Sequence, residues 1–516
     1  MSRLFLEVSM RKALVFSFML GFFVRLIPEI LAFPHPTGFD TVWYAYLMKK
    51  SVIWPHWSTF FTSTWLLYVI IVPLYNVLRV DPFLILKVLV SVLFGLNVAG
   101  VFWFARKMLG WNVRLSVLAA GFFAVQLASL RISWDLLRNT LGLGVLLFTL
   151  PFIKKLDSKS GFACFVLFSL LTVFAHEYAA VTLLVTVLGL LFYRIFKRRV
   201  NLEDKRLFLA VSPALTVFVI GVYLRIFPIR YTVETNFIGV RDIVPANVGG
   251  IFFLVNYLQI KTSVDFYASY FYLFLKVLAL FCLLYLPYLF FVLKGFFRNE
   301  VLSVWTGLLM VGSFGCLFSP FCALQCWHRW MFMLVYPFTF YAVNGLRFFL
   351  RMDEGEKFRL KIGFSNRKAK GMVLLTVMLG CVYLATPFLM STVNIGLFSF
   401  PVSEYFSSAP TVPYQDVNGV INSMKWLNEN MDSNSCVVLQ HAFFFWGALY
   451  LDKSHMIVHF ESDVDLAVHT AFDHGFNRVF FVWWNQPIGW YGVTVPEYFV
   501  SRKNFGRISV FEFSHV

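Results

Sequence analysis

Apolar runs long enough to cross a lipid bilayer recur along most of this sequence, and they constrain its fold more than any other feature. The 516 residues are 59% hydrophobic and only 14% charged. A soluble protein of this size has too little interior to bury that much apolar surface. Because a bilayer core needs ~20 apolar residues per helix, the sequence predicts an α-helical polytopic membrane protein.

Eleven apolar segments are candidate membrane-spanning helices. They comprise residues 12–33, 83–104, 115–130, 136–153, 161–176, 178–193, 207–227, 269–293, 301–318, 331–346 and 371–393. Several are short, which is compatible with a polar cavity that dips into the membrane. One further stretch, residues 62–78, is apolar but contains Pro73. It is expected either to span the membrane or to lie on its surface, and the orientation of the chain decides between the two.

Lys and Arg are distributed unevenly between the segments that connect these helices. One alternate set holds 22 Lys and Arg, namely residues 105–114, 154–160, 194–206, 294–300 and 347–370. The other set holds only 9, namely residues 34–82, 131–139, 176–177, 228–268 and 319–330. Since cytoplasmic loops accumulate Lys and Arg, the first set and the N-terminus are expected in the cytoplasm. The net charge of +17 has this origin and does not indicate a nucleic-acid partner.

This orientation requires an even number of crossings between Lys12 and Arg106. Two clear spans already supply that number. Residues 62–78 are therefore expected to form a juxtamembrane or re-entrant helix on the outer side, where a proline within the helix is easily accommodated.

The tail of the chain has a different character. Short strand-like runs, "SCVVLQ", "HMIVHF" and "NRVFFVWW", alternate with the helix-like stretches "VNGVINSMKWLNENM" and "SDVDLAVHTAFDHG". The second helix has Ser462 or Asp463 as its expected N-cap and Gly475 as its stop. We therefore expect a small extracytoplasmic α/β domain at 401–516 after a transmembrane domain at 1–400, whose first outer loop is 34–82.

Four polar clusters are predicted on the outer face. The first span, which carries Arg25 and Glu29, is followed by "GFDTVWYAY" with Asp40. The other three clusters are "LRISWDLLRN" with Asp135 and Arg138, "AHEY" with His176 and Glu177, and "LQCWHRWM" with His328 and Arg329. Ionisable groups at membrane depth are costly and are generally functional. Their position on one side favours a common site.

Each cluster also has a purely structural interpretation. Asp135 and Arg138 are one helical turn apart and could form a local salt bridge. His176 and Glu177 could cap helix ends, and Arg329 could extend to lipid phosphates. The aromatic rings that follow Asp40, those of Trp43, Tyr44 and Tyr46, could form an interfacial belt.

These motifs resemble the GT-C superfamily of membrane glycosyltransferases, which includes the oligosaccharyltransferase catalytic subunit, the protein O-mannosyltransferases and the lipid A aminoarabinose transferases. "GFDTVWYAY" is similar to the essential acidic motif of their first outer loop, in the form of archaeal or bacterial members. Asp135 stands where these enzymes carry a second acidic motif. Asn485 of "VWWNQP" replaces the Asp of the oligosaccharyltransferase Trp-Trp-Asp tripeptide, and the first loop lacks the adjacent Asp-Glu pair of O-mannosyltransferases. The resemblance is therefore to the superfamily.

The resemblance implies transfer of a sugar from a polyprenyl-phosphate-linked donor to an extracytoplasmic protein, lipid or glycan at the cell membrane. Asp40 is the expected base, and Asp135 and Glu177 are further catalytic candidates. Arg329, with His328, is the expected phosphate clamp, because a guanidinium group matches phosphate bidentately. The remaining candidates for substrate binding are His35, Tyr44 and Arg138. Asp40, Asp135 and His176 are the candidate ligands of a divalent cation, Mg²⁺ or Mn²⁺.

A transporter or flippase of a lipid-linked or small polar substrate is the alternative function. It would also place charges within the membrane around a substrate cavity. Transporters tend to show related halves and spans broken near the bilayer midplane, and the sequence shows neither.

Overall fold

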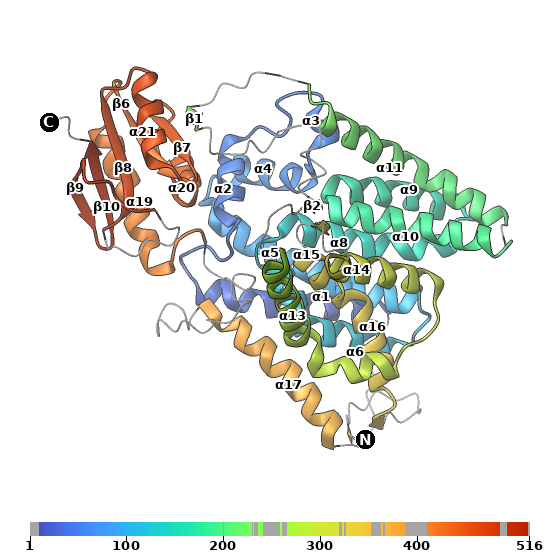
Figure 1. The fold of residues 1–516 in the computed structure, drawn as a ribbon. Helices are drawn as coiled ribbons and strands as arrows, with labels where there is room; N and C mark the ends of the chain where they lie inside the picture. The colour runs from blue at the N-terminus through green and yellow to red at the C-terminus, as the bar shows by residue number, and fades with distance from the viewer. Residues whose placement is uncertain are drawn as a thin grey trace.

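The computed structural model describes most of the chain: residues 10–199, 201–229, 231, 236–240, 258–260, 266–318, 322–324, 327–351, 363–364, 367–387, 410–485 and 493–513. A bundle of long helices makes up the larger part of the molecule, and a β-sheet with its own helices lies at one end of the bundle beside α2 (Thr41–Lys50) (Figure 1).

Six helices of the described residues are long and apolar enough to cross a membrane: α1 (Met10–Leu31), α5 (Pro82–Lys107), α10 (Glu177–Phe196), α11 (Leu202–Ile226), residues Leu273–Lys294 of α13 (Phe266–Lys294), and α14 (Glu300–Phe318). α6 (Val113–Ala124) and α7 (Leu127–Asp135) are bent by 63° relative to each other and together are a candidate seventh. These helices confirm the predicted multi-pass helical architecture.

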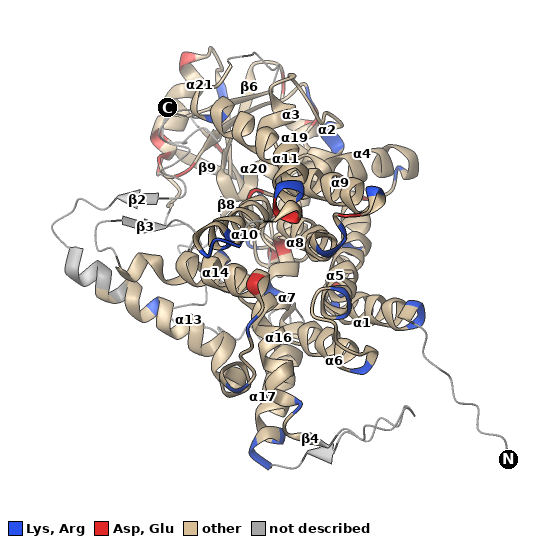
Figure 2. Ribbon diagram, turned by 90° about the vertical axis from the view of Figure 1, so that its right-hand side faces the viewer, with Lys and Arg blue, Asp and Glu red and all other residues tan. Residues whose placement is uncertain are grey.

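The other predicted spans contain shorter or interrupted helices, or a helix with a basic start. They are α8 (Leu137–Thr149), α9 (Lys159–Ala175), α15 (Trp327–Met333) with α16 (Val335–Leu346), and α17 (Arg367–Leu384). The total of eleven spans therefore stays a prediction. Figure 2 shows Lys and Arg at the starts of α1 and α17, the ends of these helices that are remote from the first loop.

The first loop after α1 folds into three helices, α2, α3 (Thr59–Thr62) and α4 (Leu66–Leu78). The 13 residues of α4 extend for ~20 Å, which is shorter than a ~30 Å bilayer core. Leu67 and Ile71 on α4 are fully buried, and the helix packs against α2, α5, α8 and α9. This length and packing agree with the predicted juxtamembrane helix.

Within the part of the chain that the structure describes, the C-terminal sheet has six strands in the order β1-β7-β6-β8-β10-β9, of which β1 is Phe237–Gly239. β6 (Ser435–Gln440) pairs in parallel with β7 (Met456–Phe460) and β8 (Arg478–Trp484), while β10 (Ile508–Phe513) pairs antiparallel with β8 and β9 (Phe499–Phe505). α19 (Tyr414–Asn430), α20 (His441–Tyr450) and α21 (Val464–Asp473) pack on the sheet.

Several of these elements were predicted from the sequence. The three predicted strands are present as β6, β7 and β8, and the predicted helices are present as α19 and α21. Asp463 caps α21 by accepting a hydrogen bond from the Leu466 amide at 2.9 Å, and Gly475 follows with φ +85°. The predicted domain boundary at residue 400 lies outside the described residues.

The edge strand β1 (Phe237–Gly239) comes from the segment between α11 and α13, far from the rest of the sheet in sequence. It pairs in parallel with β7, with Phe237 opposite Ile457. Hydrogen bonds from the Ile457 amide to the Asn236 carbonyl (2.9 Å) and from the Val240 amide to the His459 carbonyl (3.0 Å) extend this pairing. The loop predicted on the outer face and the C-terminal sheet therefore lie on the same side of the bundle.

The aromatic stripe of α2 joins the bundle to the C-terminal sheet and its helices. The ring of Trp43 lies 4.9 Å from that of Phe445 on α20, and the ring of Tyr46 lies 6.0 Å from it. Phe83 at the start of α5 contacts Trp446 at 5.8 Å. In place of an interfacial belt facing lipid, Trp43 and Tyr46 therefore form a docking surface for α20.

Candidate functional site

A buried ionic triad lies at the junction of α1, α5 and the first loop. The Glu29 side chain, 3% exposed, forms an ion pair with Arg25 (Nη1 to Oε1, 2.8 Å) and accepts a hydrogen bond from Lys87 Nζ at 3.1 Å. The Thr37 hydroxyl donates to the same carboxylate. Buried charges are tolerated when they are paired and hydrogen-bonded in this way. The triad consequently holds the start of the first loop against two helices.

Arg25 also reaches across to the end of α7. Its Nε donates to the Ser133 carbonyl and its Nη2 to the Trp134 carbonyl, both at 3.3 Å, and its guanidinium group lies 4.8 Å from the centre of the Trp134 ring. The carbonyls of a last helical turn have no partner within their own helix. Arg25 satisfies two of them and so holds the position of the next residue, Asp135.

Gly38 allows the first loop to pass directly against Asp135. Its φ is +85°, a conformation that favours glycine. A Cβ atom at this position would lie 2.7 Å from the Trp134 carbonyl oxygen and 2.8 Å from the Asp135 Cβ atom. Two residues later the loop reaches Asp40, so the first and second predicted acidic motifs are adjacent in space.

Asp40 stands at the N-cap position of α2, but its side chain makes no capping hydrogen bond. Burial and the negative charge of Asp135 raise the pKa of the Asp40 carboxyl to about 6. The positive charges of Arg329, Arg138 and Arg131 act in the opposite direction. A carboxylate with a pKa close to neutrality is well suited to accept a proton.

Asp135 pairs with Arg131. The purely structural interpretation of the sequence expected a salt bridge with Arg138 instead. Arg131 Nη1 lies 2.5 Å from Oδ1 and Nη2 lies 3.5 Å from Oδ2, and both side chains are almost fully buried. The two residues are one turn apart on α7, so a single helix presents the pair.

Arg138 bonds to side chains of the first loop. Its Nη1 donates to Thr64 Oγ1 at 2.8 Å, and the guanidinium group is also hydrogen-bonded to the Tyr44 hydroxyl. Tyr44 is only 2% exposed and its ring lies 6.4 Å from that of Tyr68. These contacts make Tyr44 a residue that positions Arg138.

His176 separates α9 from α10 in an extended conformation, with φ −165° and ψ 143°. Its Nδ1 accepts a hydrogen bond from the Tyr178 amide at 3.2 Å, so the expected capping role is present. Burial lowers the pKa of the imidazole to about 3, Arg138 and Arg329 contribute to this, and Glu177 opposes it. The ring is therefore neutral at physiological pH.

Glu177 begins α10 and forms an ion pair with Arg225 of α11. Arg225 Nε donates to the Thr62 carbonyl at 2.8 Å, so the pair also connects α10 and α11 to α3. Glu177 is close enough to His176 to raise the pKa of its imidazole. Its carboxylate thus lies at the border of the polar cluster.

His328 and Arg329 lie at the start of α15. The Arg329 charge lowers the pKa values of Asp40, His176 and His328. Burial is the main reason that the pKa of His328 falls to about 3. Arg329 therefore belongs to the same electrostatic cluster as the two acidic motifs.

The structure thus brings most of the predicted site residues together. The polar cluster consists of Asp40, Asp135, Arg138, His176, Glu177, His328 and Arg329, to which the structure adds Arg131. His35 instead contacts the start of α19, where the Tyr414 ring lies 6.5 Å away. Lys87 was not anticipated, although a lysine within an apolar run is a detectable signal.

The side chains of the cluster fit a divalent cation poorly. Among the described residues, no group of three or more His, Cys, Asp or Glu side chains is placed to hold a metal ion. Of the predicted ligands, Asp135 directs both carboxylate oxygens at Arg131, and His176 Nδ1 accepts a backbone amide. The positive charges of three arginines act on the remaining ligand, Asp40.

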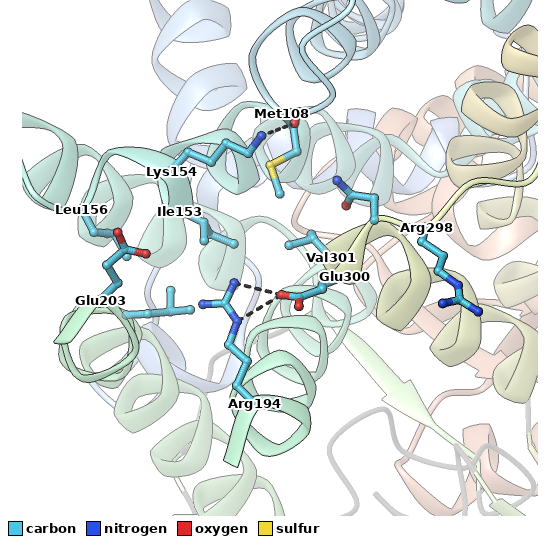
Figure 3. Close-up of a pocket in the computed structure, with 11 residues that line it drawn as sticks. Met108, Ile153, Lys154, Leu156, Arg194, Glu203, Arg298, Glu300 and Val301 are labelled. Atoms are coloured by element: carbon cyan, nitrogen blue, oxygen red, sulfur yellow. Dashed lines mark hydrogen bonds and ion pairs between the residues drawn. The ribbon is translucent and has the colours of Figure 1, made fainter. Parts of the chain in front are cut away.

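A cavity of about 330 Å³ lies at the opposite end of the bundle (Figure 3). α10 has 20 residues and extends for ~30 Å from Glu177 in the polar cluster to Phe196, and Arg194 in its last turn lines this cavity. Arg194 contacts Glu300 at 3.0 Å and Asp204 at 2.6 Å. Arg194 and Glu300 of this cavity are thus paired with each other, and the cavity is separate from the polar cluster.

No model of a known protein family and no curated protein matches this chain. Among solved structures, the crystal structure of the Archaeoglobus fulgidus oligosaccharyltransferase in its apo form superposes with a TM-score of 0.51. The fold is similar to that of an archaeal oligosaccharyltransferase. The match covers 93% of this chain and 70% of the oligosaccharyltransferase chain at 11% sequence identity, so the likeness is one of fold. It confirms the architectural resemblance expected from the motifs.

The sequence "WWN" has a structural role in the C-terminal sheet, at the position compared above with the oligosaccharyltransferase tripeptide. Trp483 and Trp484 are each 1% exposed, and their indole nitrogens donate to the Val493 carbonyl (3.0 Å) and to Asp416 Oδ2 (2.8 Å). Asn485 Nδ2 donates to the Gly506 carbonyl at 2.8 Å. All three side chains thus have hydrogen-bond partners within the C-terminal part of the chain.

Proposed function

We propose that this protein is a membrane glycosyltransferase that moves a sugar from a polyprenyl-phosphate-linked donor to an extracytoplasmic acceptor. The observation that carries the proposal is the junction of Gly38 with Asp135. This junction places a base candidate, Asp40, beside a second buried acid and two arginines that can bind phosphate. The oligosaccharyltransferase-like fold supports this class of reaction over a transporter or flippase.

Asp40 acts as the general base in the proposed mechanism. It accepts the proton of the acceptor nucleophile while that nucleophile forms a bond to C1 of the sugar. The bond between C1 and the phosphate oxygen breaks, and the oxygen keeps the electron pair. Arg329 and Arg138 stabilise the negative charge that develops on the phosphate, since guanidinium groups bind phosphate oxygens in a fork. Asp135 holds Arg131 and adds to the negative potential that keeps Asp40 basic.

An apolar cavity of about 300 Å³ below Arg138 is the proposed site of the donor's lipid. Leu141, Val145 and Phe148 line it from α8, at 3, 7 and 10 residues after Arg138 and hence on the same helix face. α5 and α9 contribute the other walls. α4 packs against all three helices. The cavity's apolar lining suits a polyprenyl chain whose phosphate is bound at Arg138.

The C-terminal sheet is proposed to lie outside the cell membrane, on the acceptor side. Its pairing with β1 supports this, because β1 belongs to a loop with few Lys and Arg. Because the side chains of "WWN" are hydrogen-bonded within the protein, the proposal assigns this tripeptide no part in selecting the acceptor. The acceptor is a protein, lipid or glycan with an exposed hydroxyl or amide.

Transfer of a radiolabelled sugar from a polyprenyl phosphate to membrane acceptors by the purified protein tests the proposal. Asp40→Asn keeps the shape of the side chain but removes the base, so transfer should fall ~10²–10⁴-fold while donor binding persists. Asp81→Asn is the matched control, because Asp81 is an exposed acid of the same loop and should leave transfer unchanged. Wild-type transfer by Asp40→Asn would contradict the mechanism. Passage of the labelled lipid across vesicles without transfer would instead indicate a flippase.

A further inference from the structure

The balance of charge at the Asp40–Asp135 pair differs from that of a divalent-cation site. Such sites offer carboxylate and carbonyl oxygens, with little competing positive charge. Here the two acids are accompanied by Arg131, Arg138 and Arg329, all close enough to act on Asp40. Among the described residues that act on Asp40, together with Asp40 itself, two negative and three positive charges sum to one net positive charge. The neighbouring Glu177 and Arg225 neutralise each other.

The positions of the individual groups lead to the same conclusion. A cation at Asp135 would have to displace both nitrogens of Arg131 from a buried pair. Breaking a buried ion pair is strongly unfavourable, because it leaves a charge without compensation. Arg138, in contrast, is held at the edge of the centre by the neutral hydroxyls of Thr64 and Tyr44. Its charge is therefore not neutralised by these partners.

We propose that Arg138 and Arg329 supply the positive charge for the leaving phosphate, so that transfer at this site requires no divalent cation. The proposal rests on the glycosyltransferase function proposed above. It also selects the donor: one net positive charge complements a polyprenyl monophosphate sugar, a phosphodiester with one negative charge, better than a diphosphate with two. As the bond between C1 and oxygen breaks, the leaving phosphate gains one further negative charge beside these arginines. The proton of the acceptor passes to Asp40.

Two measurements on the purified full-length protein test this proposal. The first is transfer from a monophosphate donor in EDTA, and the second is Mn²⁺ binding followed by its electron paramagnetic resonance signal. We expect transfer rates within about twofold with and without EDTA, and no stoichiometric Mn²⁺. Arg329→Ala should reduce transfer ~10²–10³-fold, the loss typical of one group that stabilises developing charge. Arg206→Ala, which removes an exposed charge paired with Asp157 at the far end of the bundle, is the control.

The possible outcomes separate this proposal from the more general one. Loss of transfer in EDTA with recovery in Mn²⁺ or Mg²⁺, or one bound Mn²⁺ that Asp40→Asn abolishes, would overturn the arginine proposal and leave the glycosyltransferase function intact. Preference for a diphosphate donor would overturn the donor assignment. If no donor supports transfer under any condition, the glycosyltransferase function fails. The Mn²⁺ signal alone then decides whether the centre binds a cation.

Discussion

Replacing Gly38 by alanine tests the contact that brings the two acidic motifs together. The φ of +85° costs an alanine ~1–2 kcal/mol, because its Cβ crowds the backbone in the left-handed region. The same Cβ would lie 2.7 Å from the Trp134 carbonyl oxygen and 2.8 Å from Asp135 Cβ. Neither atom is the flexible end of a side chain, so the loop or α7 must move, and such overpacking costs a further ~1–3 kcal/mol.

We therefore expect Gly38→Ala to lower the free energy of unfolding by about 2–5 kcal/mol in total. The displacement also separates Asp40 from Asp135. A shift of ~1 Å in a reacting group can reduce the rate ~10²-fold, so transfer should fall by at least that factor. Thermal unfolding in detergent and transfer from the labelled donor measure the two effects on the same preparation.

Gly475→Ala is the matched control for this experiment. Gly475 also has a φ of +85°, but a Cβ there would meet no atom within 4 Å. It should show only the ~1–2 kcal/mol backbone cost and full transfer activity. If Gly38→Ala matched Gly475→Ala in stability and kept wild-type transfer, the contact with Asp135 would not position the site.

Three further predictions follow from the same geometry. Glu29→Gln removes the negative charge that pairs with both the buried guanidinium group of Arg25 and the buried ammonium group of Lys87. It should lower the free energy of unfolding by ~3–5 kcal/mol, measured by thermal unfolding. A loss below ~1 kcal/mol would mean that the triad is dispensable. Because the base must be ionised and the pKa of Asp40 is raised to about 6, transfer should decline as the pH falls below about 6. A transfer rate that stays unchanged down to pH 4 would contradict the role of this carboxylate. Cysteines introduced at the exposed positions Val52 and Asp81 should react with an impermeant thiol reagent from outside, and one at Lys159 only after permeabilisation, in a protein without its native cysteines. If the cysteine at position 81 were labelled only after permeabilisation, α4 would cross the membrane and would not be a juxtamembrane helix.

The sequence by itself determined the class of the protein and predicted which polar residues form its site. The length of an apolar run is a local property, so α1, α5, α10 and the other long helices could be recognised one by one. The alternation of strands and helices near the C-terminus is equally local, and β6, β7 and β8 appear where the pattern predicts them. Lys and Arg counts then predicted that the four polar clusters lie on one side, and most of the predicted site residues lie close together in the structure.

The partners within the site were decided by tertiary packing. Asp135 has arginines at three and four residues along the chain, and spacing alone does not distinguish them; the break after α7 turns Arg138 toward Thr64 and leaves Arg131 on the acid. Arg25 reaches Ser133 and Trp134 across more than 100 residues.

The same holds for the sheet and for the surface of α2. β1 joins β7 from a different part of the chain, and Trp43 and Tyr46 pack on α20 where the local pattern allowed a lipid-facing belt. An aromatic ring buries its surface equally well against lipid or protein, and a short strand needs only an open edge. Which surface or edge is available depends on where the rest of the chain has folded.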